Sequence, residues 1–187
     1  MEKIITSPVC EEELLKLRAG DRVFISGYIY TARDAAHKRL IDLVDQGKKL
    51  PIEVKDQIIY YAGPTPAKPG KVIGSAGPTT SGRMDSFTPK LLDMGLKCMI
   101  GKGARSEEVI KSIVENKAVY FAAVGGAAAL ISKSIVECKV IAYEDLGSEA
   151  IRKLKVEKFP AIVVVDSNGN NLYEMGRKNY LDKFTNK

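Results

Sequence analysis

A glycine-bounded polar loop lies near the middle of the chain, over residues 77–85, with the sequence Gly-Pro-Thr-Thr-Ser-Gly-Arg-Met-Asp. An apolar run over 72–76 precedes it, and a helical pattern that begins at Thr88-Pro89 follows it. A strand, a polar loop and a helix in this order point backbone N–H groups and a helix N-terminus at an anion. Glycines free the backbone, and Arg83 can bind a carboxylate or phosphate through two hydrogen bonds. The loop therefore predicts a small-anion site at the end of a strand.

Strand and helix patterns alternate on both sides of this loop. Strands are predicted at 22–30, 57–61, 72–76, 96–100, 118–124 and 135–143, and helices at 10–17, from Asp34 to Gly47, at 88–94, from Ser106 onward and at 127–132. A β-hairpin is predicted at the end, from 159–166 through the turn Asn168-Gly169 to 172–175. This order favours an α/β domain with a mixed sheet, and 187 residues suit one domain, alone or with an appendage.

Two more glycine-containing turns follow predicted strands, at 101–103 (Gly-Lys-Gly) and at 125–126 (Gly-Gly). The lone Gly-Lys-Gly lacks the remaining glycine and the Ser/Thr of a nucleotide P-loop. Ligands in open α/β folds bind at the carboxyl ends of strands. We therefore expect Arg33, the 79–83 loop and Lys102 to converge.

The segment around Arg33 contributes two further candidates, Asp34 and His37. Asp34 is a good N-cap for the helix that follows. Arg33 and His37 are four positions apart, so they can share one side of the helix start. His37 is the one histidine of the chain. Spacing alone slightly favours a solvent-exposed histidine, while its place one turn from a strand end keeps a role in the site open.

The chain is basic, with a net charge of +6 at pH 7. The lysines and arginines are dispersed and mostly alternate with acids, only 7% of residues are aromatic, and tryptophan is absent. A nucleic-acid binder typically clusters its cations or interleaves them with stacking aromatics. The composition favours a solvated basic surface, with a few cations that converge on an acidic metabolite.

Neither a membrane span nor a metal site is indicated. No apolar run approaches the ~20 residues needed to cross a bilayer, and the start Met-Glu-Lys-Ile-Ile-Thr lacks a signal-peptide layout, so a cytoplasmic protein is expected. Cys10, Cys98 and Cys138 form no Cys-x-x-Cys pair. Three thiols could ligate an iron–sulfur cluster, but Cys98 and Cys138 lie in apolar runs, which favours core thiols and no metal ligand in this chain.

Taken together, the 77–85 loop, Thr88-Pro89 and the 101–103 turn resemble the β-subunit or C-terminal domain of class I fumarate hydratases and the related L(+)-tartrate dehydratase β-subunit. Three further segments support the resemblance, namely 27–38, 125–128 and 157–166. It covers nearly the whole chain, which implies a single domain over 1–187 with a swivelling β/β/α fold.

The resemblance implies a hydro-lyase that hydrates fumarate reversibly to L-malate, with tartrate dehydration as the alternative. A [4Fe–4S] cluster would act as the Lewis acid. The cluster cysteines of the family lie outside this domain, so an α-subunit is expected to supply the cluster. The resemblance thus implies a heterotetramer of two α- and two β-subunits, and a chain that is inactive alone.

The resemblance also implies roles for single residues. Arg33 and Arg83 match the arginines that bind the substrate carboxylates, and Lys102 matches the lysine of the glycine turn. Thr79 matches the threonine proposed to take the proton from C3 of malate. Other positions match the substrate-binding loop or the segment beside it, and these are Thr80, Ser81 and Gly82, and Asp34 and His37.

The chemistry agrees with these residue types. Two cationic clamps fix both ends of a dicarboxylate, and cations stabilise charge that develops next to a carboxylate as a proton leaves. A threonine hydroxyl is a poor base unless cations favour its alkoxide or it relays the proton onward. The rival interpretation is a non-catalytic anion-binding module. On the hydro-lyase interpretation, the loops at Arg33, 79–83 and Lys102 should form an open site that a partner covers.

Overall fold

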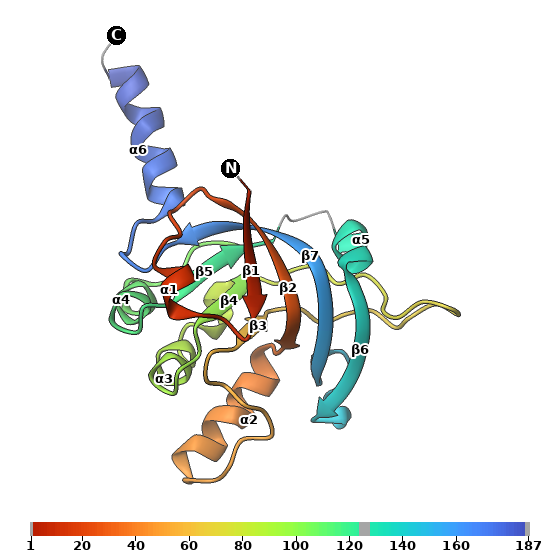
Figure 1. Ribbon diagram of the computed structural model, residues 1–187. Helices are drawn as coiled ribbons and strands as arrows, with labels where there is room; N and C mark the ends of the chain where they lie inside the picture. Colours follow the sequence, from red (N-terminus) through yellow and green to blue (C-terminus); the bar gives the residue numbers. More distant parts are fainter. Residues whose placement is uncertain (1, 124–127, 186–187) are drawn as a thin grey trace.

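Five strands close into a barrel in the computed structural model, which describes residues 2–123 and 128–185 (Figure 1). The barrel strands are β2 (Arg22–Thr31), β3 (Ile58–Tyr60), β4 (Cys98–Gly101), β5 (Val119–Ala122) and β7 (Ile151–Val165). β2 to β5 run parallel, and β7 is antiparallel to both β5 and β2, so it closes the ring. The prediction of a mixed sheet in an α/β domain is confirmed.

Two more strands extend this barrel. β1 (Lys3–Ser7) pairs parallel with the first half of β2, and β6 (Ile135–Ala142) pairs antiparallel with β7. The helices are α1 (Glu11–Leu14), α2 (Asp34–Asp45), α3 (Thr88–Asp93), α4 (Glu107–Glu115), α5 (Ala128–Ile131) and α6 (Leu172–Thr185), with 3₁₀ turns η1 (Ser81–Met84), η2 (Ser132–Ser134) and η3 (Glu144–Glu149). Among the described helices, none has the length and hydropathy of a membrane span.

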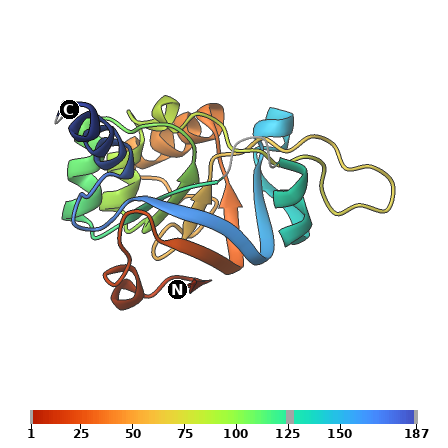
Figure 2. The same cartoon turned by 90° about the horizontal axis from the view of Figure 1, so that it is seen from above.

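Side chains of the central strands alternate between two apolar cores. Ile58, Tyr60, Ile100 and Phe121 point into the barrel and pack with residues of β2 and β7. Their neighbours on the same strands, such as Ile59 and Tyr120, face outward into a second core that α2, α3 and α4 cover. Figure 2 shows these helices gathered on one side of the molecule. Successive strand residues point to opposite faces, so strands buried on both faces become continuously apolar.

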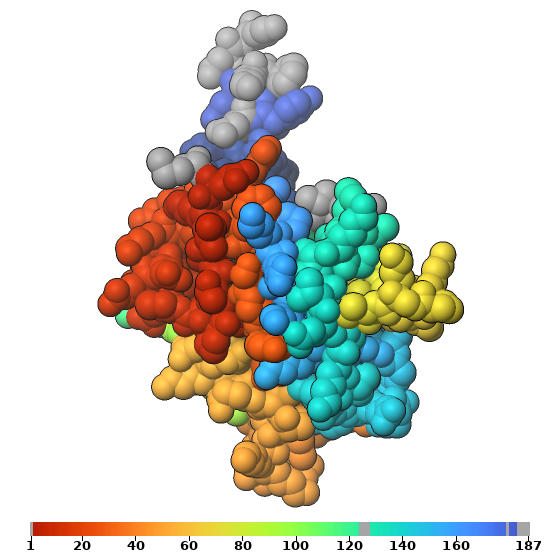
Figure 3. All heavy atoms as spheres, turned by 45° about the vertical axis from the view of Figure 1, so that its right-hand side comes forward, coloured from red at the N-terminus to blue at the C-terminus, as the bar shows by residue number. Residues whose placement is uncertain are grey.

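Two predicted strands are wrong. Residues 72–76 form no ladder and belong instead to an arm over 63–76, which projects from the body (Figures 2 and 3). At its base, the Thr65 N–H donates to the Ser75 carbonyl at 3.0 Å, and the Ser75 N–H donates to the Thr65 hydroxyl at 2.9 Å. Residues 172–175 begin helix α6 rather than the second strand of a hairpin, although 166–170 do form the predicted turn.

Helix starts were only partly predictable. Ser106 is the N-cap of α4, and its hydroxyl accepts from the Val109 N–H at 3.3 Å, as expected. The predicted cap Asp34 is instead the first residue of α2, and α3 begins at Thr88, where the pattern predicted a helix start. Thr88 uses its hydroxyl to donate to the Met84 carbonyl at 2.9 Å. The predicted Gly125-Gly126 turn lies outside the described residues.

Candidate active site

The polar loop lies across the carboxyl ends of β3 and β4. The Thr79 N–H donates to the carbonyl of Tyr61, directly after β3, at 2.7 Å. Thr80 pairs with Lys102, directly after β4, in an isolated parallel bridge. The loop therefore occupies the strand-end position that the sequence indicated, even though no strand leads into it.

Ser81 locks the loop to the Lys102 turn. Its N–H donates to the Lys102 carbonyl at 2.8 Å, and its hydroxyl accepts from the Lys102 N–H at 3.1 Å and from the Tyr120 hydroxyl at 2.9 Å. A Cβ on Gly101 would lie 1.9 Å from the Ser81 hydroxyl oxygen, so this close approach requires glycine. The Ser81 side chain is fully buried and its hydroxyl serves the turn, whereas Thr80 and Lys102 are exposed.

An alternating chain of charges joins the loop to the start of α2. The Arg83 Nε lies 2.7 Å from Asp34 Oδ1, and Asp34 Oδ2 lies 3.7 Å from Arg33 Nη2. The same Arg33 nitrogen lies 3.4 Å from a carboxylate oxygen of Glu149 in η3. The structure thus brings Arg83 of η1 together with Arg33 and Asp34 at the start of α2, which lie 50 and 49 positions earlier in the chain.

The two arginines differ in exposure. The Arg33 side chain is 20% exposed, and that of Arg83 is 52% exposed. Arg33 Nε and Asp34 Oδ2 are buried without a hydrogen-bond partner among the described residues. Exposed ion pairs contribute about 0–1 kcal/mol to stability, so an incoming anion can replace the Asp34 contact on Arg83 at small cost.

His37 is a core residue, so the interpretation as a solvent-exposed histidine is wrong. Its ring is fully buried, with the Tyr61 ring edge-on at 5.3 Å between centroids. Nδ1 lies 2.9 Å from the Arg33 carbonyl oxygen, which can only accept, so Nδ1 carries the proton of the neutral ring. Burial lowers the pKa of His37 to about 4. His37 therefore supports the backbone of Arg33 from behind.

Sequence reasoning missed three residues that surround this site: Tyr120, Arg105 and Glu149. Glu149 also accepts from the Ala35 N–H at 3.1 Å, across 114 positions of sequence. An acid at the end of a short 3₁₀ turn carries no local pattern that would mark it. Tyr120 reads as an ordinary strand residue, and Arg105 follows the glycine turn without any motif of its own.

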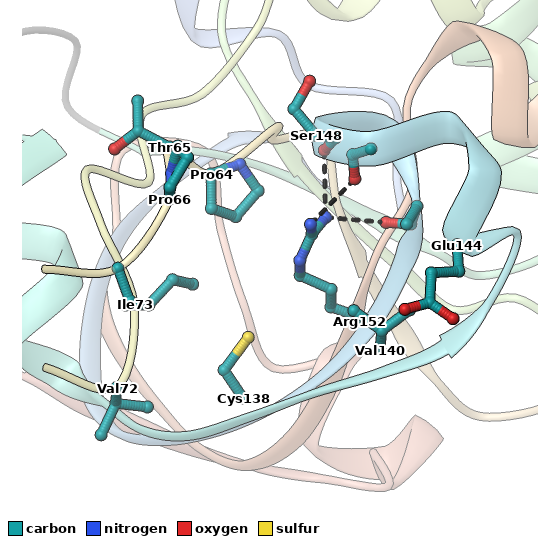
Figure 4. A pocket seen from close by; sticks show the side chains of 13 residues that line it. Pro64, Thr65, Pro66, Val72, Ile73, Cys138, Val140, Glu144, Ser148 and Arg152 are labelled. Carbon is teal, nitrogen blue, oxygen red and sulfur yellow. Dashed lines mark hydrogen bonds between the residues drawn. The ribbon is translucent and has the colours of Figure 1, made fainter. Parts of the chain in front are cut away.

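A cavity of about 480 Å³ lies beside the site rather than in it (Figure 4). The arm lines it on one side with Pro64 and Ile73, and β6 and β7 line it on the other with Cys138 and Arg152. The Arg152 guanidinium already donates to three backbone carbonyls in 147–150, at 2.8–3.2 Å. The Arg152 guanidinium is therefore already engaged by the backbone, whereas Arg83 is largely exposed and is held by the Asp34 carboxylate.

The cysteines do not fit a metal cluster held by this chain. Cys98 is buried inside the barrel, where burial raises the pKa of its thiol well above the usual range. Cys138 is half-buried on β6, and Cys10 is exposed before α1. Within residues 2–123 and 128–185, no group of three His, Cys, Asp or Glu side chains could hold a metal ion.

Comparison with known proteins decides the family. The sequence pattern described as the fumarase C-terminus matches residues 2–176. The chain belongs to the fumarase C-terminal family. The 77–85 loop and the 101–103 turn predicted this family, and the prediction is confirmed.

The members most similar to this chain fall into two kinds. It is 41% identical to the anaerobic class I fumarate hydratase of Escherichia coli K12 and 39% identical to fumarate hydratase 2 of Leishmania major, in each case over 87% of this chain. The alignments cover only 30% and 29% of those relatives, so the chain spans less than a third of their length. By contrast, it is 37% identical to a Methanocaldococcus jannaschii protein named as a candidate β-subunit of L(+)-tartrate dehydratase, with 92% of each chain covered. Both names denote hydro-lyase activities.

Proposed function

We propose that this chain is the β-subunit of an iron–sulfur hydro-lyase that hydrates fumarate reversibly to L-malate. The observation that carries the proposal is the chain of ion pairs that links Arg83, in the 79–83 loop, to Arg33 through Asp34. Lys102 is held to the same loop through Thr80 and Ser81. Backbone contacts hold Lys102 beside the loop, and ion pairs link Arg83 of the loop to Arg33 through Asp34. We propose that these three cations bind one small dicarboxylate.

In this proposal Arg33 and Arg83 bind the substrate carboxylates. A guanidinium matches a carboxylate with two parallel hydrogen bonds, and fixing both ends of the substrate holds the C–H and C–O bonds in register for elimination. Arg33 is the more buried clamp and is held by Glu149, while Arg83 is the more accessible one. Lys102 adds positive charge where the carboxylate gains electron density as the proton leaves.

Thr79 is proposed to receive the proton from C3 of malate. Its N–H is tied to the Tyr61 carbonyl, so the backbone at Thr79 is fixed relative to β3. A hydroxyl accepts a proton only when cations stabilise its alkoxide or when it passes the proton to a further acceptor. The proposed convergence of Arg33, Arg83 and Lys102 on this loop favours the first of these routes.

The resemblance to class I fumarate hydratases implies a cluster and a partner outside this domain. Its own cysteines do not fit a [4Fe–4S] cluster, and it spans less than a third of the class I fumarate hydratases. We propose that an α-subunit holds the cluster, which supplies Lewis-acid chemistry when bound. The β-subunit binds and orients the substrate, and two copies of each subunit form the complex.

The experiment is anaerobic co-expression of this chain with its α-subunit, with fumarate formation from L-malate followed by ultraviolet absorbance. Activity is expected in the complex and not in the chain alone. Arg83→Ala should lower kcat/KM by about 10²-fold or more, because it removes a charged carboxylate contact. Thr79→Ala should lower kcat by about 10²–10⁴-fold, the range for loss of a general base.

Arg39→Ala is the matched control for the arginine variant. Arg39 also pairs with an exposed aspartate, Asp145, but on α2 away from the loop. It should retain the activity of the unmodified complex. An intact complex that turns over neither malate nor tartrate would contradict the hydro-lyase proposal.

Tartrate dehydration is the second candidate, because the archaeal relative with 92% coverage carries that name. The substrates differ only in hydroxyl groups, and both are C4 dicarboxylates that two arginines can clamp. A comparison of kcat/KM for L-malate and L(+)-tartrate with the same complex separates them. A preference for tartrate would replace fumarate hydration in the proposal. A non-catalytic anion-binding module predicts anion binding without turnover of either substrate.

A further inference from the structure

A buried arginine lies behind the polar loop, and the proposed reaction gives it no role. The Arg105 side chain is 0% exposed, and its guanidinium lies between the rings of Tyr61 and Tyr120, at 5.4 Å and 5.0 Å from their centroids. Nε donates to Asp85 Oδ1 and Nη2 donates to the Thr88 hydroxyl, both at 2.7 Å. Arg105 therefore connects the end of the loop and the start of α3 to two aromatic rings of the strands beneath.

Asp85 is held from two directions. Besides the Arg105 bond, its second carboxylate oxygen accepts from the Ser106 N–H at 2.6 Å. Asp85 is the last residue of the 77–85 loop, and Ser106 is the N-cap of α4. The end of the loop is thereby fixed to the segment that follows the Lys102 turn.

Tyr120 fixes the other end of the same unit. Its hydroxyl lies 2.9 Å from the Ser81 hydroxyl and 2.9 Å from the Gly103 carbonyl, so it spans the loop and the turn. Its ring carries the Arg105 guanidinium on one face. Arg105 and Tyr120 together thus hold both ends of the 81–85 segment against the turn that presents Lys102.

Stability alone does not account for this arrangement. A buried ion pair is weak evidence for stability, because desolvation offsets the attraction and apolar replacements of similar volume are often neutral or stabilising. A planar guanidinium with directed donors instead fixes the orientation of the groups that it binds. The atoms it orients belong to the two segments that carry Arg83 and Lys102.

We infer that Arg105 and Tyr120 form a buried positioning unit that sets the spacing between Arg83 and Lys102, and with it the affinity of the site for a dicarboxylate. The inference deepens the proposed function and relies on it only for the identity of the anion. Neither residue touches the anion, since both are buried behind the loop. They act through Asp85, Ser81 and the carbonyl of Gly103.

The test is a titration of the full chain with succinate, a C4 dicarboxylate that has neither the hydroxyl nor the double bond of the proposed substrates. The backbone amide signals of 79–83 and Lys102 report binding by nuclear magnetic resonance. Tyr120→Phe keeps the ring and removes the hydroxyl, so the fold should persist. We expect its dissociation constant for succinate to rise about tenfold, the loss that one or two directed hydrogen bonds can cause.

Two more variants make the test specific. Arg105→Lys keeps the charge but loses the fork that reaches Asp85 and Thr88 together, so its dissociation constant should rise at least as much as that of Tyr120→Phe. Tyr28→Phe removes a hydroxyl that lies 3.4 Å from Glu137, on the far β2–β6 surface, and should bind succinate like the unmodified chain. A merely structural role lowers the folded fraction without changing the dissociation constant of the folded molecules.

Each outcome decides the inference. Unchanged dissociation constants in Tyr120→Phe and Arg105→Lys overturn it, and so does a failure of succinate to shift the amides of 79–83 and Lys102 in the unmodified chain. Binding that depends on Tyr120, in a chain whose complex turns over neither malate nor tartrate, supports the inference and removes the proposed function instead.

Discussion

A single imidazole lies behind Arg33, one of the two arginines proposed to bind the substrate. His37 is fully buried, and both its backbone N–H and its ring Nδ1 lie within 2.9 Å of the Arg33 carbonyl oxygen. The one hydrogen bond of its ring among the described residues therefore fixes Arg33, the residue just before α2. Burial holds the ring neutral near pH 7 because a charged imidazole would lose its hydration.

This burial makes stability depend on pH in one direction. The pKa of His37 is about 4 in the folded chain and near 6.5 in the unfolded chain, so the unfolded state binds the proton first. The contribution is present above pH 6.5 and is lost as the pH falls towards 4. Between pH 7 and pH 5 the free energy of unfolding should fall by about 2 kcal/mol, measured by urea denaturation.

His37→Gln is the control for this prediction. Glutamine keeps an N–H donor near the Arg33 carbonyl but does not titrate, and the chain has one histidine, so no other imidazole contributes. The variant should be less stable at pH 7 and should lose the histidine part of the slope. An equal slope in both proteins would contradict the assigned burial.

At the scale of elements, the loop and the end of β4 are in direct van der Waals contact. The Ser81 hydroxyl occupies the space that a side chain on Gly101 would need, and Tyr61 lies 3.1 Å from the same position. The glycine at the strand end is therefore required by packing, not by a left-handed backbone. The positions of Arg83 and Lys102 depend on how closely these two elements approach.

Gly101→Ala should separate them. The new methyl group cannot fit without a shift of the loop, so we expect a loss of about 2 kcal/mol in the free energy of unfolding or more, within the range for overpacked cores. Succinate binding at the loop should weaken in the same variant. Denaturant unfolding and the amide titration measure the two effects.

Gly176→Ala is the matched substitution in α6. No atom lies within 4 Å of its Cβ position, so the helix should gain roughly 0.5–1 kcal/mol from the lower entropy of the unfolded chain. If Gly101→Ala were as well tolerated as Gly176→Ala, the close contact between Ser81 and β4 would be wrong.

Over the whole molecule, barrel closure places the site on the most enclosed strands. β3, β4 and β5 are paired on both edges and buried on both faces, whereas β1 and β6 each pair on one side only. The arm over 63–76 projects from this framework and has its exposed tip at 65–72 (Figure 3). A rigid base under the loops keeps the arginines and the lysine at fixed distances.

Hydrogen exchange should follow this order. Amides of 58–60, 98–101 and 119–122 should exchange most slowly, because they open only when the barrel opens, and those of 66–74 should exchange fastest. Mass spectrometry of the full chain in deuterated buffer measures both groups in one experiment. Equal protection of the arm and the central strands would contradict the free-standing arm.

The sequence by itself determined the local features and their chemistry. The β2 to β5 strand patterns, the Ser106 cap and the polar loop with its Arg83 are each specified within a few residues, by side-chain period, capping chemistry or glycine placement. The α/β class and the fumarase C-terminal family followed from those short segments. These predictions are confirmed because each depends on residues that are close together in the chain.

Tertiary structure decided the features that depend on distant residues. Residues 72–76 are apolar enough for a strand, but none of the strands in 2–123 and 128–185 pairs with them. The polar start of β7 becomes a strand because β2 and β6 pair with it. His37 is buried in a core where the rings of Tyr61 and Phe87 pack against it. Glu149 reaches Arg33 only through the folded chain. Burial and ion pairing are contacts between segments, and a local pattern does not contain them.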